Sequence, residues 1–228
     1  MSYSHEYVRK IQRQLELPEI PERITLARRG DFLFTIINED NSEALIATLE
    51  RRDPQSDWGF REWIEEAMLY PGFAVSVRRE GDAEDSGFLV FDTRVFIHGW
   101  QNAPDTSRVS ICLEPKAVYV APDARGHGFG SAFVELLAGQ LQHTLAAVAA
   151  TSSDQFRHLG MNEIRLAIEG DCVSEEGFRF MGHALDRCKT AHADFAETYK
   201  GRWPVAVGVE DCIDYDEWGN DHDPQATP

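Results

Sequence analysis

The chain has 228 residues, of which 43% are hydrophobic and 27% charged, a composition typical of a globular protein. Its 39 acidic and 22 basic residues give a formal net charge of −17, which disfavours general nucleic-acid binding and favours cationic partners. The N-terminal residues are polar, and no apolar run approaches the ~20 residues that a membrane span needs. The four cysteines are irregularly spaced, so we expect free thiols in a cytoplasmic protein that binds neither nucleic acid nor membrane.

Hydrophobic periodicity and the Gly and Pro positions predict an alternation of helices and strands. In chain order these are helix 5–15, strands 24–27 and 32–37, helices 40–52 and 58–69, strands 73–79, 88–97 and 109–120, helix 127–150, strand 164–168, helix 174–199 and strand 205–209. Asp40 and Glu43 resemble a capping box at the start of the second helix. Pro115 is expected to disturb the longest strand. The apolar helix faces place Trp63 and Phe178 in the core.

These elements divide the chain into three parts. Residues 1–30 form an N-terminal extension with a short helix, residues 31–209 form the domain, and residues 210–228 form an acidic, partly disordered tail. The segment 205–228 carries seven acids and no Lys or Arg, a composition that does not support a packed core.

The segment 117–133 carries the clearest chemical signal. A strand ends at Val120, and three glycines at alternate positions, Gly126, Gly128 and Gly130, precede an amphipathic helix. Glycine allows close approach to the backbone, and the free N–H groups and dipole of a helix N-terminus attract anions. The pattern therefore predicts a cradle for a phosphate or pyrophosphate. A Walker loop would need a lysine here, and the dinucleotide fingerprint has a different glycine spacing.

These residues resemble the signature of the GNAT superfamily of acyl-CoA N-acyltransferases, Arg/Gln-x-x-Gly-x-Gly/Ala. Here the signature spans Arg125 to Gly130, and Val120-Ala121-Pro122-Asp123 matches the family's usual lead-in. The order of predicted elements from 31 to 209 is also that of the family. The resemblance implies an α+β fold, an α/β/α sandwich. Its mixed, mostly antiparallel twisted sheet has six to seven strands with helices on both faces, and the family's fourth and fifth strands splay into a V.

The resemblance also implies acetyl-CoA as the co-substrate, without a metal. The pantetheine arm would pair with backbone along Val118, Tyr119 and Val120. The pyrophosphate would lie on the N–H groups of the loop and the first helical turn, at Arg125, Gly126, His127, Gly128, Phe129, Gly130 and Ser131. Cys188 and His192 have chelating spacing on a predicted helix, but two ligands alone do not define a metal site.

Transfer to an amine requires the amine to lose a proton before it attacks the thioester. The family often places a glutamate on its fourth strand, six residues before the last pantetheine contact, which gives Glu114. The alternatives are a solvent-facing glutamate, and Asp105 as the base.

The leaving thiolate needs a proton, which the family often supplies from a tyrosine. Met181 occupies that position here, and methionine has no proton to donate. Cys172, Ser174 or Tyr199 is the donor, or the thiolate leaves unassisted, or the protein does not catalyse.

Two functions follow from the resemblance. The first is an N-acetyltransferase acting on a cationic acceptor: a lysine, a protein N-terminus, a polyamine or an amino-sugar. The second is a non-catalytic module that binds acyl-CoA or docks a partner. A toxin that acetylates charged transfer RNA would need a basic surface, which the net charge of −17 disfavours. A homodimer is an open alternative.

Overall fold

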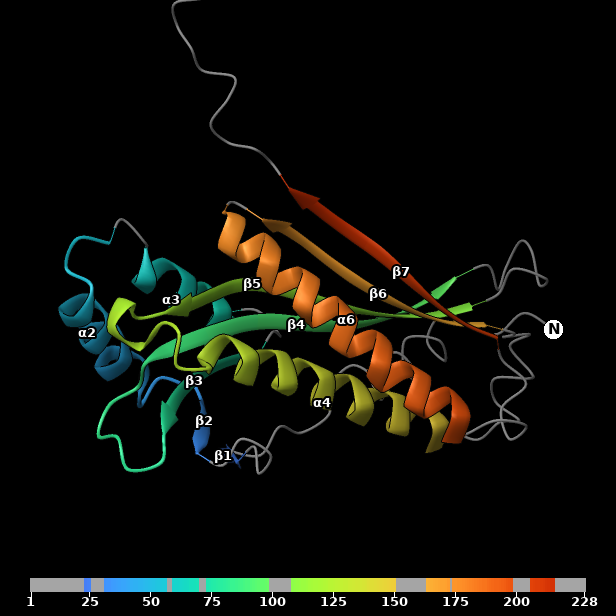
Figure 1. Cartoon of the computed structure of the whole chain (residues 1–228), viewed down its shortest axis with the longest axis horizontal. Coiled ribbons are helices and arrows are strands. Elements are labelled where there is room, and N and C mark those ends of the chain that lie inside the picture. The colour runs from blue at the N-terminus through green and yellow to red at the C-terminus, as the bar shows by residue number, and fades with distance from the viewer. Residues whose placement is uncertain are drawn as a thin grey trace, which may run out of the picture.

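The computed structural model describes residues 23–25, 31–56, 59–69, 73–98, 108–150, 163–172, 174–198 and 206–215. Its elements are, in chain order, β1 (Arg23–Thr25), β2 (Phe32–Ile36), α2 (Ser42–Arg52), α3 (Phe60–Leu69), β3 (Phe73–Arg79), β4 (Gly87–His98), β5 (Arg108–Val120), the 3₁₀ turn η3 (Pro122–Ala124), α4 (Phe129–Ala150), β6 (Glu163–Cys172), α6 (Glu175–Thr198) and β7 (Ala206–Tyr215). Figure 1 shows these elements along the molecule. The predicted helix 5–15 lies outside the described residues.

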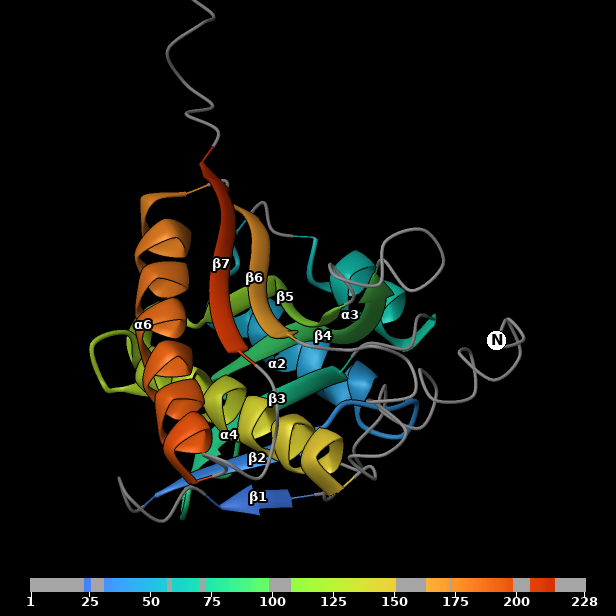
Figure 2. The ribbon, with the colours of Figure 1, turned by 90° about the vertical axis from the view of Figure 1, so that its right-hand side faces the viewer.

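The strands form one seven-stranded sheet in the order β1-β2-β3-β4-β5-β6-β7. Neighbours are antiparallel from β1 to β5, and the β5–β6 and β6–β7 pairs are parallel. Helices α4 and α6 cover one face, and α2 and α3 lie on the other (Figures 1 and 2). The structure thus confirms the predicted α+β class, with a mostly antiparallel sheet between two helical layers.

Strands β5 and β6 separate part-way along their length. They pair from Arg108 with Glu163 to Leu113 with Ile168, and beyond this point β5 pairs only with β4 while β6 pairs only with β7. Figure 1 shows the two strands diverging, which is the V that the sequence predicts. The β4–β5 register also shifts at Pro115, leaving Lys116 unpaired as a bulge, because proline has no N–H for the ladder.

The core lies on both faces of the sheet. On one face, Phe34 packs against Phe133 of α4, with 5.7 Å between ring centroids. On the other face, Phe60 of α3 packs against Phe88 and Tyr119, with centroid distances of 6.4 and 4.7 Å. These aromatic contacts hold α4 and α3 against opposite faces of the sheet.

Two aromatic side chains predicted to lie in the core are instead exposed, Trp63 by 37% and Phe178 by 44%. Among the α3 side chains described, from Phe60 to Glu66, the buried ones are Phe60 and Ile64, and Trp63 lies beside them. In α6 the buried positions begin at Met181, one turn after Phe178. Both predictions were wrong because an apolar residue at the margin of a helical stripe does not have to reach the sheet.

The ends of two elements also differ from prediction. Helix α2 begins at Ser42, and its N-cap Asn41 makes no side-chain capping bond, so the predicted capping box is wrong. Instead, the Asn41 side chain accepts from Asn38 N at 2.9 Å and donates to Ile36 O at 2.8 Å, which holds the chain in a turn before the helix.

Strand β7 extends to Tyr215, so residues 210–215 belong to the sheet rather than to the predicted tail.

Burial of His192 predicts a pH-dependent stability. Its side chain is 6% exposed, Nε2 has no hydrogen-bond partner within the described structure, and burial lowers its pKa. The unfolded chain therefore binds a proton more readily than the folded one, and stability falls as pH drops below ~6.5, by up to about 1.4 kcal/mol per pH unit. In urea titrations from pH 8 to 5.5, His192→Leu should flatten this fall. His143→Leu, at an exposed α4 position, should not; equal slopes in both variants would contradict the prediction.

Candidate functional site

The loop between β5 and α4 makes a compact turn from strand into helix. Turn η3 is closed by Ala124 N donating to Ala121 O at 2.8 Å. Gly126 and Gly128 follow with φ of 77° and 90°, a region that other residues rarely adopt. The helix begins at Phe129, two residues later than predicted, because the chain is still turning at Gly128.

The first turn of α4 presents N–H groups that the helix itself does not use. The first backbone bond of the turn runs from Ala132 N to Gly128 O at 3.0 Å. The N–H groups of Gly128, Phe129, Gly130 and Ser131 thus precede the helical ladder. None of them donates to a backbone acceptor among the described residues. Together with the helix dipole, they make the start of α4 a candidate anion site.

Arg79, at the end of β3, holds this loop in place. Its Nη2 donates to His127 O at 2.7 Å, and its guanidinium lies 5.5 and 5.9 Å from the ring centroids of Phe32 and Phe129. The two rings also contact each other edge to face at 4.9 Å. Arg79 therefore fixes the loop and places a positive charge beside it. No sequence signal indicates this role, because the contact spans 48 residues.

Arg52, at the end of α2, holds the turn that leads into the loop. It donates to both carboxylate oxygens of Asp123 at 2.8 and 2.9 Å, and to Asp85 O at 2.7 Å. This hydrogen-bonded partner lowers the pKa of Asp123. Arg125 folds back on the strand, where its Nε donates to Val120 O at 3.1 Å. The guanidinium of the signature arginine therefore bonds to β5, and backbone N–H groups form the anion site.

The three residues expected along the pantetheine arm lie on the free part of β5, where β6 has separated. Val118 and Val120 are half-buried. Tyr119 is 4% exposed, packs against Phe60, and donates its hydroxyl to Asp53 Oδ2 at 2.7 Å. Burial and this bond raise the pKa of Tyr119. Its side chain belongs to the core, so only its backbone is available to a ligand.

Five charged residues meet where the V begins, and we call them the vertex cluster: Asp92, Arg94, Glu114, Lys116 and Glu169. Arg94 forms an ion pair with Glu114 and lies 3.5 Å from Asp92 and 3.8 Å from Glu169. Lys116 Nζ lies 3.9 Å from Glu114. Three carboxylates and two cations leave this vertex with a net negative charge.

Glu114 and Glu169 are the first residues beyond the last β5–β6 pair. The sequence indicated Glu114 but not Glu169, Asp92 or Arg94, whose proximity depends on strand register. Burial and a hydrogen bond to Glu169 raise the pKa of the neighbouring Cys112 to about 12. The Cys112 thiol is therefore protonated at neutral pH. Glu114 is 26% exposed and paired with Arg94, and its role as a base stays a prediction.

Met181 fills the narrow end of the V. It is 3% exposed, and a Cβ built on Gly170 of β6 would lie 2.8 Å from its Cε and 3.4 Å from Pro115 O of β5. The thioether thus packs between the two strands just beyond their last pair. Met181 is a core residue at the position where the family often has a tyrosine.

The other predicted proton donors are only partly described. Ser174 Oγ accepts from Gly177 N at 3.0 Å, so Ser174 caps α6. Cys172 is 4% exposed. Tyr199 and Asp105 lie outside the described residues. The burial of Cys172 and the capping role of Ser174 give no support for either residue as the proton donor.

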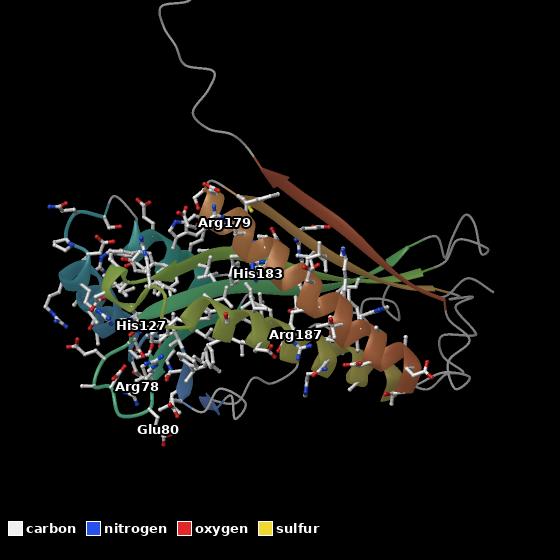
Figure 3. All side chains as sticks on the ribbon, viewed as in Figure 1. Arg78, Glu80, His127, Arg179, His183 and Arg187 are labelled. Atoms are coloured by element: carbon white, nitrogen blue, oxygen red, sulfur yellow. The ribbon has the colours of Figure 1, made fainter. Side chains whose placement is uncertain are left out.

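A groove of about 530 Å³ lies between α4 and α6, within the range of small-molecule sites. It begins at Gly130 and Ser131, which also belong to the anion site, and continues past Val134 and Phe180. Figure 3 shows Arg179, His183 and Arg187 following one another along α6 beside it. The glycine turn and the start of α4 therefore adjoin a space large enough for part of a ligand.

No family model and no curated protein matches the chain. Solved structures do match it, all at low identity. Ribosomal-protein-alanine N-acetyltransferase from Brucella melitensis biovar Abortus 2308 is 16% identical, covers 65% of this chain and 87% of its own, and has a TM-score of 0.36. The aminoglycoside N-acetyltransferase AAC(6')-Iy, solved with CoA, is 17% identical, covers 75% and 90%, and has a TM-score of 0.29. A Trypanosoma brucei acetyltransferase is 13% identical, covers 66% and 88%, and has a TM-score of 0.31.

These TM-scores are low, so the chain's own topology carries the fold assignment. The strand order, the separation of β5 from β6, and the glycine loop before α4 are those of a GNAT-like fold. Among the described helices, none combines the length and hydrophobicity needed to cross a bilayer. The described residues also contain no group of three or more potential metal ligands.

Proposed function

We propose that this protein is an acetyl-CoA-dependent N-acetyltransferase that acts on primary amines. The observation that carries the proposal is the V between β5 and β6 beside four N–H groups at the start of α4. The free edge of β5 offers backbone partners to an extended pantetheine arm. The N–H groups of Gly128 to Ser131 bind the pyrophosphate. The thioester then lies in the V near the vertex cluster.

The vertex cluster supplies the proton chemistry of the proposal. The acceptor ammonium loses a proton to Glu114, directly or through water, and the neutral amine attacks the thioester carbonyl. A C–N bond forms, the C–S bond breaks, and CoA leaves as a thiolate, while the nitrogen releases its second proton to water and becomes the neutral amide. Because Cys172 is buried and Ser174 caps a helix, the thiolate takes its proton from solvent. An alkyl thiolate is stable enough to do so, since thiols have pKa values near 8.5.

The acceptor in this proposal carries positive charge. The vertex cluster has three carboxylates for two cations, and the whole chain has a net charge of −17. Both favour a lysine side chain, a protein N-terminus, a polyamine or an amino-sugar over an anionic acceptor. The proposed setting is the cytoplasm, without nucleic-acid or membrane partners.

Release of CoA from acetyl-CoA tests the proposal. The purified chain is incubated with acetyl-CoA and a panel of diamines, aminoglycosides and lysine-containing peptides, and free thiol is measured. Amine-dependent release supports the transferase. Acetyl-CoA binding by calorimetry without release by any amine would support the alternative, a non-catalytic binding module, and absence of binding would contradict both.

Arg79 gives an independent test of the phosphate site. Arg79→Met removes both the bond to His127 O and the charge beside the loop, so the affinity for CoA should fall about 10–100-fold, the range of one charge-assisted hydrogen bond. Arg78→Met, at the neighbouring position on the opposite face of β3, is the matched control and should leave the affinity unchanged. Calorimetric Kd values for CoA measure both. Equal losses in both variants would assign the effect to general destabilisation of β3.

A further inference from the structure

The groove between α4 and α6 presents two arginines and a histidine to a ligand held at the loop. Arg179, His183 and Arg187 lie four residues apart on α6, so they share one side of the helix. All three line the groove that begins at Gly130 and Ser131, and Figure 3 shows them in sequence along α6. Three such positions beside a phosphate-binding turn are notable in a chain with a net charge of −17.

The three side chains differ in the hydrogen bonds and ion pairs that they already make. Arg187 makes two hydrogen bonds to Glu135 across the helices, at 2.8 and 3.0 Å, so it bridges the two walls of the groove and is already engaged. Arg179 pairs with Glu175 one turn away, and both side chains are about two-thirds exposed, at 66% and 65%. Such an exposed pair contributes little to stability, so an incoming anion can replace it.

His183 is exposed, and no residue in the described part of the chain bonds to it. Acids also line the groove, at Glu176 and Asp186. By helical spacing they lie one turn before and one turn after the Arg179–His183 pair. The stretch of α6 suited to an anion is therefore short and limited to these two side chains.

The covalent structure of CoA places a second phosphate near this stretch. The same ribose carries the pyrophosphate on its 5′ oxygen and a phosphate on its 3′ oxygen. With the pyrophosphate on the N–H groups of Gly128 to Ser131, the ribose enters the groove, and the 3′-phosphate lies one ribose away from the loop. The half-buried ring of Phe180 and the buried Val134 leave an apolar floor for the adenine.

We infer that Arg179 and His183 bind the 3′-phosphate of CoA, so that the protein selects CoA over its 3′-dephospho form. This inference rests on the proposed function, since it takes the pyrophosphate position as given. A phosphate bound by an arginine and a histidine makes charge-assisted hydrogen bonds, which are about twice as strong as neutral ones. We expect a preference for CoA over dephospho-CoA of about 10-fold or more.

Calorimetry with CoA and dephospho-CoA tests the inference, because the two ligands differ only in the 3′-phosphate. The full chain and the variants Arg179→Gln, His183→Gln and Arg179→Gln/His183→Gln are titrated with each ligand. The double variant should bind CoA as weakly as dephospho-CoA, while its affinity for dephospho-CoA stays that of the wild type. Lys189→Gln, an exposed α6 cation outside the groove lining, should change neither.

The outcomes separate this inference from the proposed function. Equal affinity of the wild-type chain for both ligands would overturn 3′-phosphate recognition and leave CoA binding intact. Equal weakening of both ligands by the double variant would also overturn it, since the side chains would then act on a shared part of the ligand. If neither ligand binds the wild-type chain, the proposed function itself fails.

Discussion

Gly128→Val should weaken CoA binding by at least about 100-fold. Gly128 has φ of 90° and comes just before α4, where its own N–H and those of the next three residues form the proposed pyrophosphate site. A branched side chain here occupies the space through which the phosphate reaches these N–H groups. Its Cβ would also lie 3.6 Å from Phe32 Cζ, which limits how far the loop can shift to relieve the crowding.

Backbone strain is the competing explanation for such a loss, and Gly126→Val controls for it. Gly126 also has a positive φ, 77°, and a Cβ there would have no atom within 4 Å. Both variants carry the cost of a non-glycine residue in this region, about 1–2 kcal/mol, so both should lower Tm. Only Gly128→Val should lose CoA in calorimetry. Similar affinity losses in the two variants would show that loop conformation, rather than phosphate approach, sets the binding.

The sequence predicted most of the sheet because the signals for it are local. Alternation of apolar residues marks β3 and β6, and Pro and Gly mark the C-terminal end of α3 and the turn before α4. These cues depend on neighbours within a few residues, so they remain valid whatever the tertiary fold is. The glycine turn before α4 was predicted for the same reason, since its glycines and the helix behind them are contiguous.

The vertex cluster could be predicted only in part, because it is built from three strands. Glu114 follows from counting along β5, but its pairing with Arg94 depends on the β4 register. That register shifts at the Lys116 bulge, and no pattern in the sequence fixes a bulge to one residue. Glu169 joins the cluster because β6 leaves β5 one residue earlier. The point of separation is a property of the packed sheet.

The structure shows how Met181 packs at the position where the family often has a proton-donating tyrosine. The sequence shows that the proton-donating tyrosine is absent, but not what takes its place. In the structure, the thioether packs against Gly170 and Pro115 between the separating strands. Gly170 has no side chain to occupy this space, so methionine and glycine form a matched pair. A tyrosine placed there would have to displace one of the strands.

Glu114→Gln should lower kcat/KM for the amine by about 10²–10⁴-fold, the usual effect of removing a general base. Glu114 is the first residue of β5 beyond its last pair with β6, so the proposal places it where the V begins. Glutamine keeps the size of the side chain and a hydrogen-bonding oxygen, but it cannot take the ammonium proton. The Kd for CoA should stay within about threefold of the wild type, because Glu114 lies far along the strand from the phosphate turn.

The rival explanation is that Glu114 acts only as the ion-pair partner of Arg94. In that case Arg94→Gln should cost as much activity as Glu114→Gln, and the double variant should cost no more than either single one. If Glu114 is the base, Arg94→Gln leaves a carboxylate that still accepts the proton. Its loss in kcat/KM is then much smaller than that of Glu114→Gln. Glu169→Gln supplies the matched control, because it removes another carboxylate that faces Arg94 at 3.8 Å. Equal losses at all three positions would show that the vertex cluster matters through its net charge, and that no one carboxylate in it takes the proton.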